Sequence, residues 1–368
     1  MYNERKKILK EIEIIRGRPI ISYVTSVRPN MSAQMAGDSI SSIIEQIELI
    51  PKGEKDIDLL LISNGGDPIT SLRIISLLRE RFKKVSVLLP YVAYSAATVL
   101  SLGADEIVMH PYSNLGPVDP QLRVSHNNAR GEQERIQFSS EDLRNYIDFI
   151  KEDIGITDQQ HLVSAAEALL KEVGTLPIGS AKRGQQLSLT LSEKLLGYHI
   201  KDQNKAKGIA KVLNSSYYHH GYAVGRKEAK EIGLPIVIPP PELERLMWLI
   251  WKDYSDEMKC EEAFDVIKEI MSDSEANRNI SRVPIVDLPA NTPPDIAQQI
   301  IITHAQQTPV ITRSALSHNV MIAAIEGSKI AKAVYNNIHI LYWRNADMSL
   351  GANSTITSTG WIENKINE

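Results

Sequence analysis

The sequence predicts an α/β protein with a mainly parallel sheet flanked by helices. Short apolar runs typical of buried strands alternate with longer segments whose apolar residues recur at helical spacing. Turns rich in glycine, proline and asparagine separate the runs, and this alternation is typical of parallel sheets covered by helices on both faces. The chain has 368 residues, which is enough for one such core and an appended region.

The expected strands and helices follow one another along the first 238 residues. We expect strands at 20–25, 58–63, 85–89, 106–109 and 235–238, and helices at 3–16, 37–50, 69–82, 96–103 and 228–232. Asp67 or Thr70 is expected to cap the helix that begins near residue 69. Residues 124–135 are polar and predict a mobile loop, and helices are expected to dominate residues 140–214.

Two proline-rich stretches divide the remainder of the chain. We expect a core at 1–238, a helical extension at 239–280 and an unassigned β-containing region at 281–368. The helical extension carries Trp248, Trp251 and Tyr254, which favour packing over a ligand cage. The C-terminal part is therefore an unassigned α+β extension.

Composition excludes several classes of protein. The net charge of −4 gives no electrostatic attraction to nucleic acid. The single cysteine, Cys260, rules out an intrachain disulfide and fits a cytoplasmic location. The charged N-terminus has no signal-peptide core. Residues 85–104 carry no charge over about the length of a bilayer span, but Pro90 and the scattered hydroxyl residues favour a buried strand, turn and helix. We expect no stable membrane span, while membrane association stays open, and we expect no cofactor and no metal site.

Two turns hold the candidate chemistry. Ser63-Asn-Gly-Gly-Asp67 closes one expected strand, and Ser95 lies between a strand and a helix of small residues. Parallel strands end at one edge of the sheet, so both turns are expected to meet where α/β proteins bind ligands. Ser95 is either a helix cap or a nucleophile supported by backbone amides, and the glycine turn beside it favours the nucleophile.

The motifs that carry a family resemblance occur in order along the chain. Residues 61–75, 93–107 and 111–121 resemble the glycine turn, the serine helix and the following strand of the Clp protease and signal peptide peptidase superfamily, and residues 222–234 resemble its closing helix. Residues 116–121 and 179–183 are similar to the subgroup called serine dehydrogenase proteinases. The resemblance covers about residues 5–255 and implies a ClpP/crotonase-like fold, with the core at 1–238 as its ClpP-like part.

The resemblance implies a serine protease or peptidase with Ser95 as its nucleophile. The amides around Gly66, Asp67 and Ala96 would form the oxyanion hole. Matching the motifs puts Asp119 where Clp proteases have the catalytic histidine and His220 where they have the aspartate. Because a triad is defined by geometry and not by order, Ser95, Asp119 and His220 can still form one, with His220 as the base and Asp119 orienting it.

Other candidates for the general base stay open. His219 is the neighbour of His220, and both could instead be surface histidines, just as Asp119 could form a turn before Pro120. Signal peptide peptidases use a lysine, but residues 139–143 hold none at the matching position. Lys182 is the better lysine, although its segment could also line a substrate groove or a subunit interface.

Two other functions compete with peptide hydrolysis. A crotonase-like acyl-CoA enzyme would use the same oxyanion architecture, and a catalytically inactive oligomeric scaffold would keep the fold alone. Tight binding of coenzyme A would favour the acyl-CoA enzyme. An intact assembly that neither hydrolyses peptides nor is labelled by a fluorophosphonate would favour the scaffold. For the leading hypothesis, the resemblance implies a peptide or protein substrate and a homo-oligomer.

Overall fold

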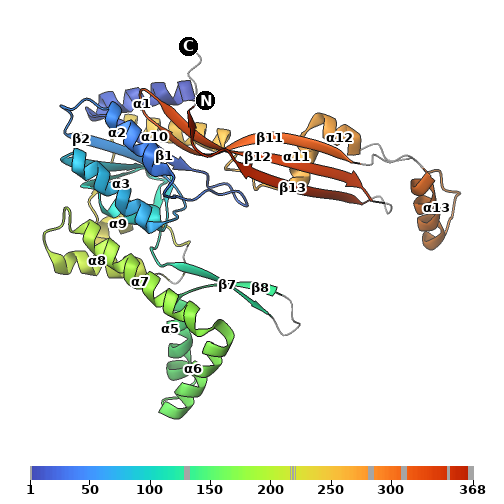
Figure 1. Ribbon diagram of the computed structural model, residues 1–368, viewed down its shortest axis with the longest axis horizontal. Coiled ribbons are helices and arrows are strands. Elements are labelled where there is room, and N and C mark those ends of the chain that lie inside the picture. The colour runs from blue at the N-terminus through green and yellow to red at the C-terminus, as the bar shows by residue number, and fades with distance from the viewer. Residues whose placement is uncertain are drawn as a thin grey trace.

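The computed structural model describes residues 2–127, 133–215, 217, 219, 221–280, 286–307, 313–345 and 349–363 (Figure 1). A mixed sheet occupies the centre of the molecule, with its described strands in the order β10-β5-β3-β2-β1-β11-β12-β13. One half of this sheet is parallel and consists of β10 (Ile236–Val237), β5 (Glu106–Met109), β3 (Lys84–Leu89), β2 (Asp56–Ile62) and β1 (Ile20–Thr25). The predicted α/β class and its parallel strands are confirmed.

The other half of the sheet is antiparallel and comes from the C-terminal region. It consists of β11 (Ser314–Glu326), β12 (Ala331–Arg344), β13 (Leu350–Ser358) and the short β14 (Ile362–Glu363). Because β11 pairs directly with β1, the strands of the C-terminal extension continue the central sheet. Figure 1 shows these strands leaving the body as a long ribbon.

Helices cover both faces of the parallel half. One face packs against α2 (Ser39–Leu49), α3 (Pro68–Arg81), α4 (Ala96–Leu102), α7 (Thr175–Leu196), α8 (Gln203–Ser215) and α9 (Arg226–Ile232). The other face packs against α1 (Tyr2–Arg16) and α10 (Pro241–Glu257). Successive residues of β2, such as Leu59 and Leu60, belong to opposite cores, which explains the unbroken apolar run in its sequence.

A buried ion-pair network joins α1 and α10 to the C-terminal strands. The Arg5 guanidinium donates two hydrogen bonds to the Glu326 carboxylate on β11, at 2.9 and 2.7 Å, and both side chains are fully buried. Tyr254 of α10 donates to the same carboxylate at 2.9 Å. Elsewhere on α10, Trp251 stacks on Tyr91 with ring centroids 4.3 Å apart, so this tryptophan packs as expected.

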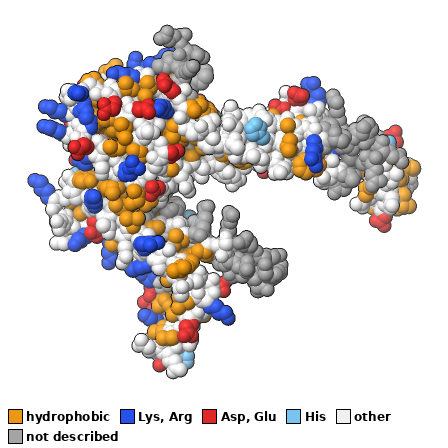
Figure 2. Space-filling view, in the orientation of Figure 1, with side chains coloured by type: hydrophobic (Ala, Val, Ile, Leu, Met, Phe, Trp, Pro, Cys, Tyr) orange, Lys and Arg blue, Asp and Glu red, His pale blue; other side chains and the backbone are white. Residues whose placement is uncertain are grey.

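The remaining elements form two arms and small sheets. One arm holds α5 (Ser140–Asp148), the π-helical turn η1 (Phe149–Asp153), α6 (Gln159–Val173) and the start of α7, beside the hairpin β7 (Gln121–Asn127) and β8 (Gln133–Ser139). The other holds the β-ribbon, α11 (Val266–Ser272), α12 (Ser274–Ile280) and α13 (Pro294–Gln307). Figure 2 shows both arms as separate projections from the body. A small sheet of β4 (Val92–Ala93), β6 (Asn114–Leu115) and β9 (Val224–Gly225) packs into the main core of the body.

Two segments decide between alternative interpretations of the sequence. Residues 124–135 were expected as a loop, but most of them belong to the hairpin, where Leu122 pairs with Phe138, and the tip lies outside the described residues. Alternating apolar residues within a polar segment explain this difference. Residues 85–104 form β3, β4 and α4. Among the described helices, none is long and apolar enough to cross a membrane.

Candidate active site

The glycine turn lies at the carboxyl end of β2 and begins α3. Asp67 caps α3, because its carboxylate accepts the Ile69 and Thr70 amides at 2.9 and 3.3 Å. The Ser63 hydroxyl accepts the Gly65 amide at 3.0 Å and so braces the turn from inside. Gly65 and Gly66 have φ angles of 100° and 149°, which side-chain-bearing residues rarely adopt. The turn therefore depends on its two glycines.

Ser95 occupies the next turn, between β4 and α4. Its φ and ψ are 52° and −118°, and a positive φ is rare for a residue with a side chain. Within the fully described α4, the Ser95 side chain makes no capping hydrogen bond. The helix-cap interpretation is therefore not supported. A strained strand-to-helix turn is the geometry that exposes a nucleophilic hydroxyl in enzymes of the α/β-hydrolase fold.

The two turns touch one another. A Cβ atom added to Gly65 would lie 2.8 Å from the Ser95 Cβ and 2.9 Å from the Ala96 nitrogen, so only glycine fits there. Met35 donates to the Gly65 carbonyl at 2.8 Å, and its carbonyl accepts the Asp67 amide at 2.9 Å. Successive amides of an extended chain point to opposite sides, so the Gly66 amide points away from Met35.

These hydrogen bonds distinguish among the three backbone amides expected to donate to the oxyanion. The Asp67 amide already donates to the Met35 carbonyl. The Gly66 amide points away from that bond, and the Ala96 amide is at the first position of α4, where helix amides have no partner within the helix. Gly66 and Ala96 are therefore the pair that can donate to a negative oxygen beside Ser95.

Both turns open into one cavity of about 580 Å³. Its walls include Asn64, Gly65, Gly66, Ser95, Ala96, Val118, Pro120, Gln121, Leu122, Ser188 and the loop residues Ser32, Ala33 and Gln34. Polar groups such as Asn64, Ser95 and Gln121 and apolar side chains such as Val118 and Leu122 share this lining. The expectation that Ser95 and Gly66 meet at one sheet edge agrees with this geometry.

The expected acid and base side chains lie in a neighbouring cavity of about 500 Å³. Asp119 and His219 both line it, together with Glu141, and Gln121 lines both cavities. Asp119 is buried, and its carboxylate accepts a hydrogen bond of 2.7 Å from the side-chain Nε2 of Gln121. Burial raises the pKa of the Glu141 carboxyl. The Asp119 charge also raises this pKa, whereas the Arg144 charge lowers it. Within one chain, Asp119 and His219 therefore line the same cavity, and Gln121 is the residue that this cavity shares with the Ser95 cavity.

The other two candidate bases differ in position. Lys182 is exposed on α7, with its Nζ 3.5 Å from the Gln185 Oε1, and it lines neither of these two cavities. His220 lies outside the described residues.

Sequence patterns did not reveal Gln121, Glu141 or the loop residues 32–34 as parts of these cavities. Asn30-Met-Ser-Ala-Gln-Met35 carries no motif, and only its pairing with the glycine turn brings it to the site. Gln121 is the last residue of the motif at 111–121, and no sequence pattern assigns it a role. A register of β7 against β8 would have been needed to place it.

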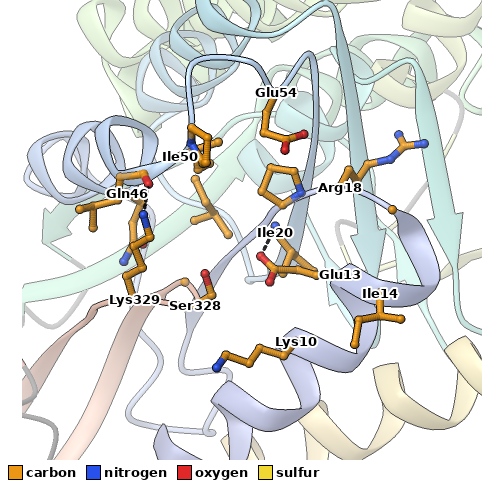
Figure 3. A pocket seen from close by; sticks show the side chains of 16 residues that line it. Lys10, Glu13, Ile14, Arg18, Ile20, Gln46, Ile50, Glu54, Ser328 and Lys329 are labelled. Carbon is orange, nitrogen blue, oxygen red and sulfur yellow. Dashed lines mark hydrogen bonds between the residues drawn. The ribbon is translucent and has the colours of Figure 1, made fainter.

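A larger cavity of about 680 Å³ lies at the opposite edge of the sheet, where β1 begins. Figure 3 shows Glu13 bonding to the backbone of Ile20 there, with Lys10 and Glu54 around the opening. Burial raises the pKa of the Glu13 carboxyl. None of the site residues expected from the sequence lines this cavity, so the candidate active site stays at the Ser95 edge.

The α/β fold and the serine–glycine site agree with the resemblance to ClpP-like serine proteinases. Residues 2–130 match a family model described as ClpP-like SDH-type serine proteinase. This match covers the N-terminal part of the chain, which holds the glycine turn and Ser95, and it agrees with the resemblance of the motifs at 61–75, 93–107 and 111–121.

Similar proteins include two from Methanocaldococcus jannaschii. The uncharacterized protein MJ0137 is 26% identical, with 65% of this chain and 75% of that protein covered. The uncharacterized protein MJ1495 is 24% identical, with 63% and 71% covered. Two solved structures are mutants of the 1510-N membrane-bound stomatin-specific protease, each 14% identical over 61% of this chain. The first has a TM-score of 0.37 with 82% of that protein covered. The second, in complex with a substrate peptide, has 0.34 with 78% covered.

Proposed function

We propose that this protein is a serine peptidase in which Ser95 attacks the carbonyl carbon of a peptide bond. The observation that carries the proposal is the strained backbone of Ser95 beside the glycine turn, in a cavity with a mixed polar and apolar lining. Gly66 and Ala96 donate their amides to the oxygen that becomes negative. Such donors are worth about 10²–10³ in kcat each in other serine peptidases.

The reaction divides into two halves. In the first, the Ser95 oxygen bonds to the peptide carbonyl carbon, its proton passes to the base, and the base then protonates the departing amine. In the second, water attacks the acyl–serine ester and gives up a proton to the same base. The ester breaks, and Ser95 recovers its proton. No oxidant, metal or cofactor enters this balance.

The base in this proposal is His220, oriented by Asp119, with His219 and Lys182 as alternatives. Burial of Asp119 and its hydrogen bond from Gln121 support a role in orienting a ring. His219 gains support from lining the same cavity as Asp119. The exposed position of Lys182 makes it the weakest of the three.

The same proposal includes a peptide or protein substrate, a cytoplasmic location and a homo-oligomeric assembly. These follow from the family resemblance.

A panel of single variants tests the proposal on the assembled full-length protein. Initial rates of peptide hydrolysis are measured for wild type, Ser95→Ala, Asp119→Asn, His219→Ala, His220→Ala and Lys182→Ala. We expect Ser95→Ala and His220→Ala to lose about 10³-fold or more in kcat, while His219→Ala and Lys182→Ala stay within a few-fold of wild type. Full activity in His220→Ala together with loss of activity in Lys182→Ala would show that Lys182, and not His220, is the base. Full activity in Ser95→Ala would overturn the function, and tight binding of coenzyme A without hydrolysis would favour the acyl-CoA alternative.

A further inference from the structure

The loop of residues 26–35 connects β1 to the segment before α2 and forms one wall of the Ser95 cavity. Ser32, Ala33 and Gln34 line that wall. The Ala33 amide donates to the Ser26 carbonyl at 2.9 Å, which closes the loop on itself. The Ser26 amide donates to the Ile322 carbonyl on β11 at 2.7 Å. The 26–35 loop is thus a closed unit attached at its base to a C-terminal strand.

The far end of this loop holds the glycine turn. Met35 is hydrogen-bonded to both neighbours of Gly66. The Met35 amide donates to the Gly65 carbonyl, and the Asp67 amide donates to the Met35 carbonyl. A Cβ atom on Gly66 would lie 2.3 Å from the Met35 oxygen, so the two backbones are too close for a side chain at residue 66. Any shift of Met35 therefore moves Gly66, whose amide direction decides how well it can stabilise an oxyanion.

The middle of the loop is anchored in the C-terminal extension. Arg28 donates through Nε to the Glu262 carbonyl and through Nη2 to the Glu269 carboxylate, both at 2.8 Å. Its guanidinium also lies over the Phe264 ring, 5.4 Å from the centroid. The Phe264 amide donates to the Pro29 carbonyl at 2.9 Å.

Packing strengthens this anchor. Met31 is buried in a core cluster whose other buried members all belong to the C-terminal extension, namely Phe264, Ile270, Ala276, Ile280, Val320, Ile338, Ile340 and Tyr342. The Arg28 side chain is only 2% exposed, and Glu269 is 9% exposed. Burial alone would raise the pKa of Glu269, but Arg28, Lys259 and His318 lower it, which keeps this carboxylate charged.

We propose that the C-terminal extension holds the oxyanion turn in its working position through the 26–35 loop, with Arg28 as the positioning residue. This inference rests on the proposed function and gives the extension a role in that reaction. Neither Arg28 nor Glu269 is among the residues that line the cavity. They act through Met35, and a buried charged pair that loses one partner is costly to the local structure.

The test uses Arg28→Ala, Arg28→Lys and Glu269→Gln in the full-length protein. Arg344→Ala is the matched control, because Arg344 also donates to a backbone carbonyl of the extension, that of Ile280, but lies on β12 and not on the 26–35 loop. Hydrogen exchange is measured at the Met35 and Asp67 amides, and hydrolysis gives kcat and KM separately. Thermal unfolding shows which variants remain folded.

We expect Arg28→Ala to speed exchange at both amides by about ten-fold or more and to lower kcat by about 10- to 100-fold with little change in KM. Glu269→Gln is expected to show the same pattern to a smaller degree. Arg28→Lys, which keeps the charge beside Glu269, should recover part of kcat. Arg344→Ala should leave exchange at both amides and kcat unchanged. If Arg28→Ala unfolds, Glu269→Gln and Arg28→Lys decide the question.

The exchange measurement separates this inference from the proposed function. Unchanged exchange at Met35 and Asp67 in folded Arg28→Ala or Glu269→Gln would overturn the inference, whether or not the protein is a peptidase. Equal losses in Arg344→Ala would also overturn it, because the effect would then be general weakening of the extension. Faster exchange in Arg28→Ala, combined with a wild type that never hydrolyses peptides, would retain the mechanical link and reject the peptidase.

Discussion

At the scale of single residues, Ser95 holds a backbone conformation that glycine adopts more easily than serine. Its φ of 52° with ψ of −118° costs on the order of 1–3 kcal/mol for a residue with a Cβ. Proteins retain such strain where it serves a site. We therefore expect Ser95→Gly to be more stable than Ser95→Ala by about 1 kcal/mol or more, with both variants inactive.

Urea unfolding of both variants checks this expectation. The comparison with Ser95→Ala removes the effect of losing the hydroxyl, because neither variant has one. Equal stability of the two variants would mean that the backbone at residue 95 relaxes in solution, and the strained-turn argument for a nucleophile would fail.

At the scale of elements, the contact between the glycine turn and the 26–35 loop leaves no room for a side chain. In Gly66→Ala the new Cβ would lie 2.3 Å from the Met35 oxygen, at a φ of 149°. We expect this variant to lose about 1–3 kcal/mol of unfolding free energy and at least ten-fold in kcat.

Gly37→Ala is the matched control for that variant. A Cβ on Gly37 would meet only the Thr70 hydroxyl, at 3.9 Å, so it should be nearly neutral in stability and activity. Hydrolysis kinetics and urea unfolding measure both variants. Wild-type kcat in Gly66→Ala would exclude the Gly66 amide from the oxyanion hole.

At the scale of the whole molecule, the two ends of the chain are joined by the buried pair of Arg5 and Glu326. Arg5→Met removes the bidentate partner of a fully buried carboxylate. We expect a loss of about 3–5 kcal/mol of unfolding free energy, because the Glu326 charge is left uncompensated. Lys7→Met on the same helix breaks only the exposed pair with Glu4 and should change stability by less than about 0.5 kcal/mol. Similar unfolding curves for the two variants would contradict a joined structure.

The sequence predicted the parallel half of this molecule well, because each strand and helix there is a local apolar pattern. It did not reveal that β11 would pair with β1, since that contact joins residues about 300 positions apart and leaves no local signal. The same limit applies at the site. Ser95 and Gly66 belong to local turns that a sequence pattern can single out, whereas Gln121 and the 26–35 loop reach the cavity only through tertiary pairing. The segment boundaries near residues 238 and 280 and the identity of the base stay predictions.

The account depends most directly on Ser95 as a nucleophile, and covalent labelling measures this. The folded full-length protein is treated with a fluorophosphonate probe, digested, and the modified peptide is identified by mass spectrometry. We expect one stoichiometric adduct on Ser95, no adduct in Ser95→Ala, and loss of hydrolysis in proportion to labelling. A folded protein that hydrolyses peptides while its adduct forms on another residue, or does not form, would contradict the account.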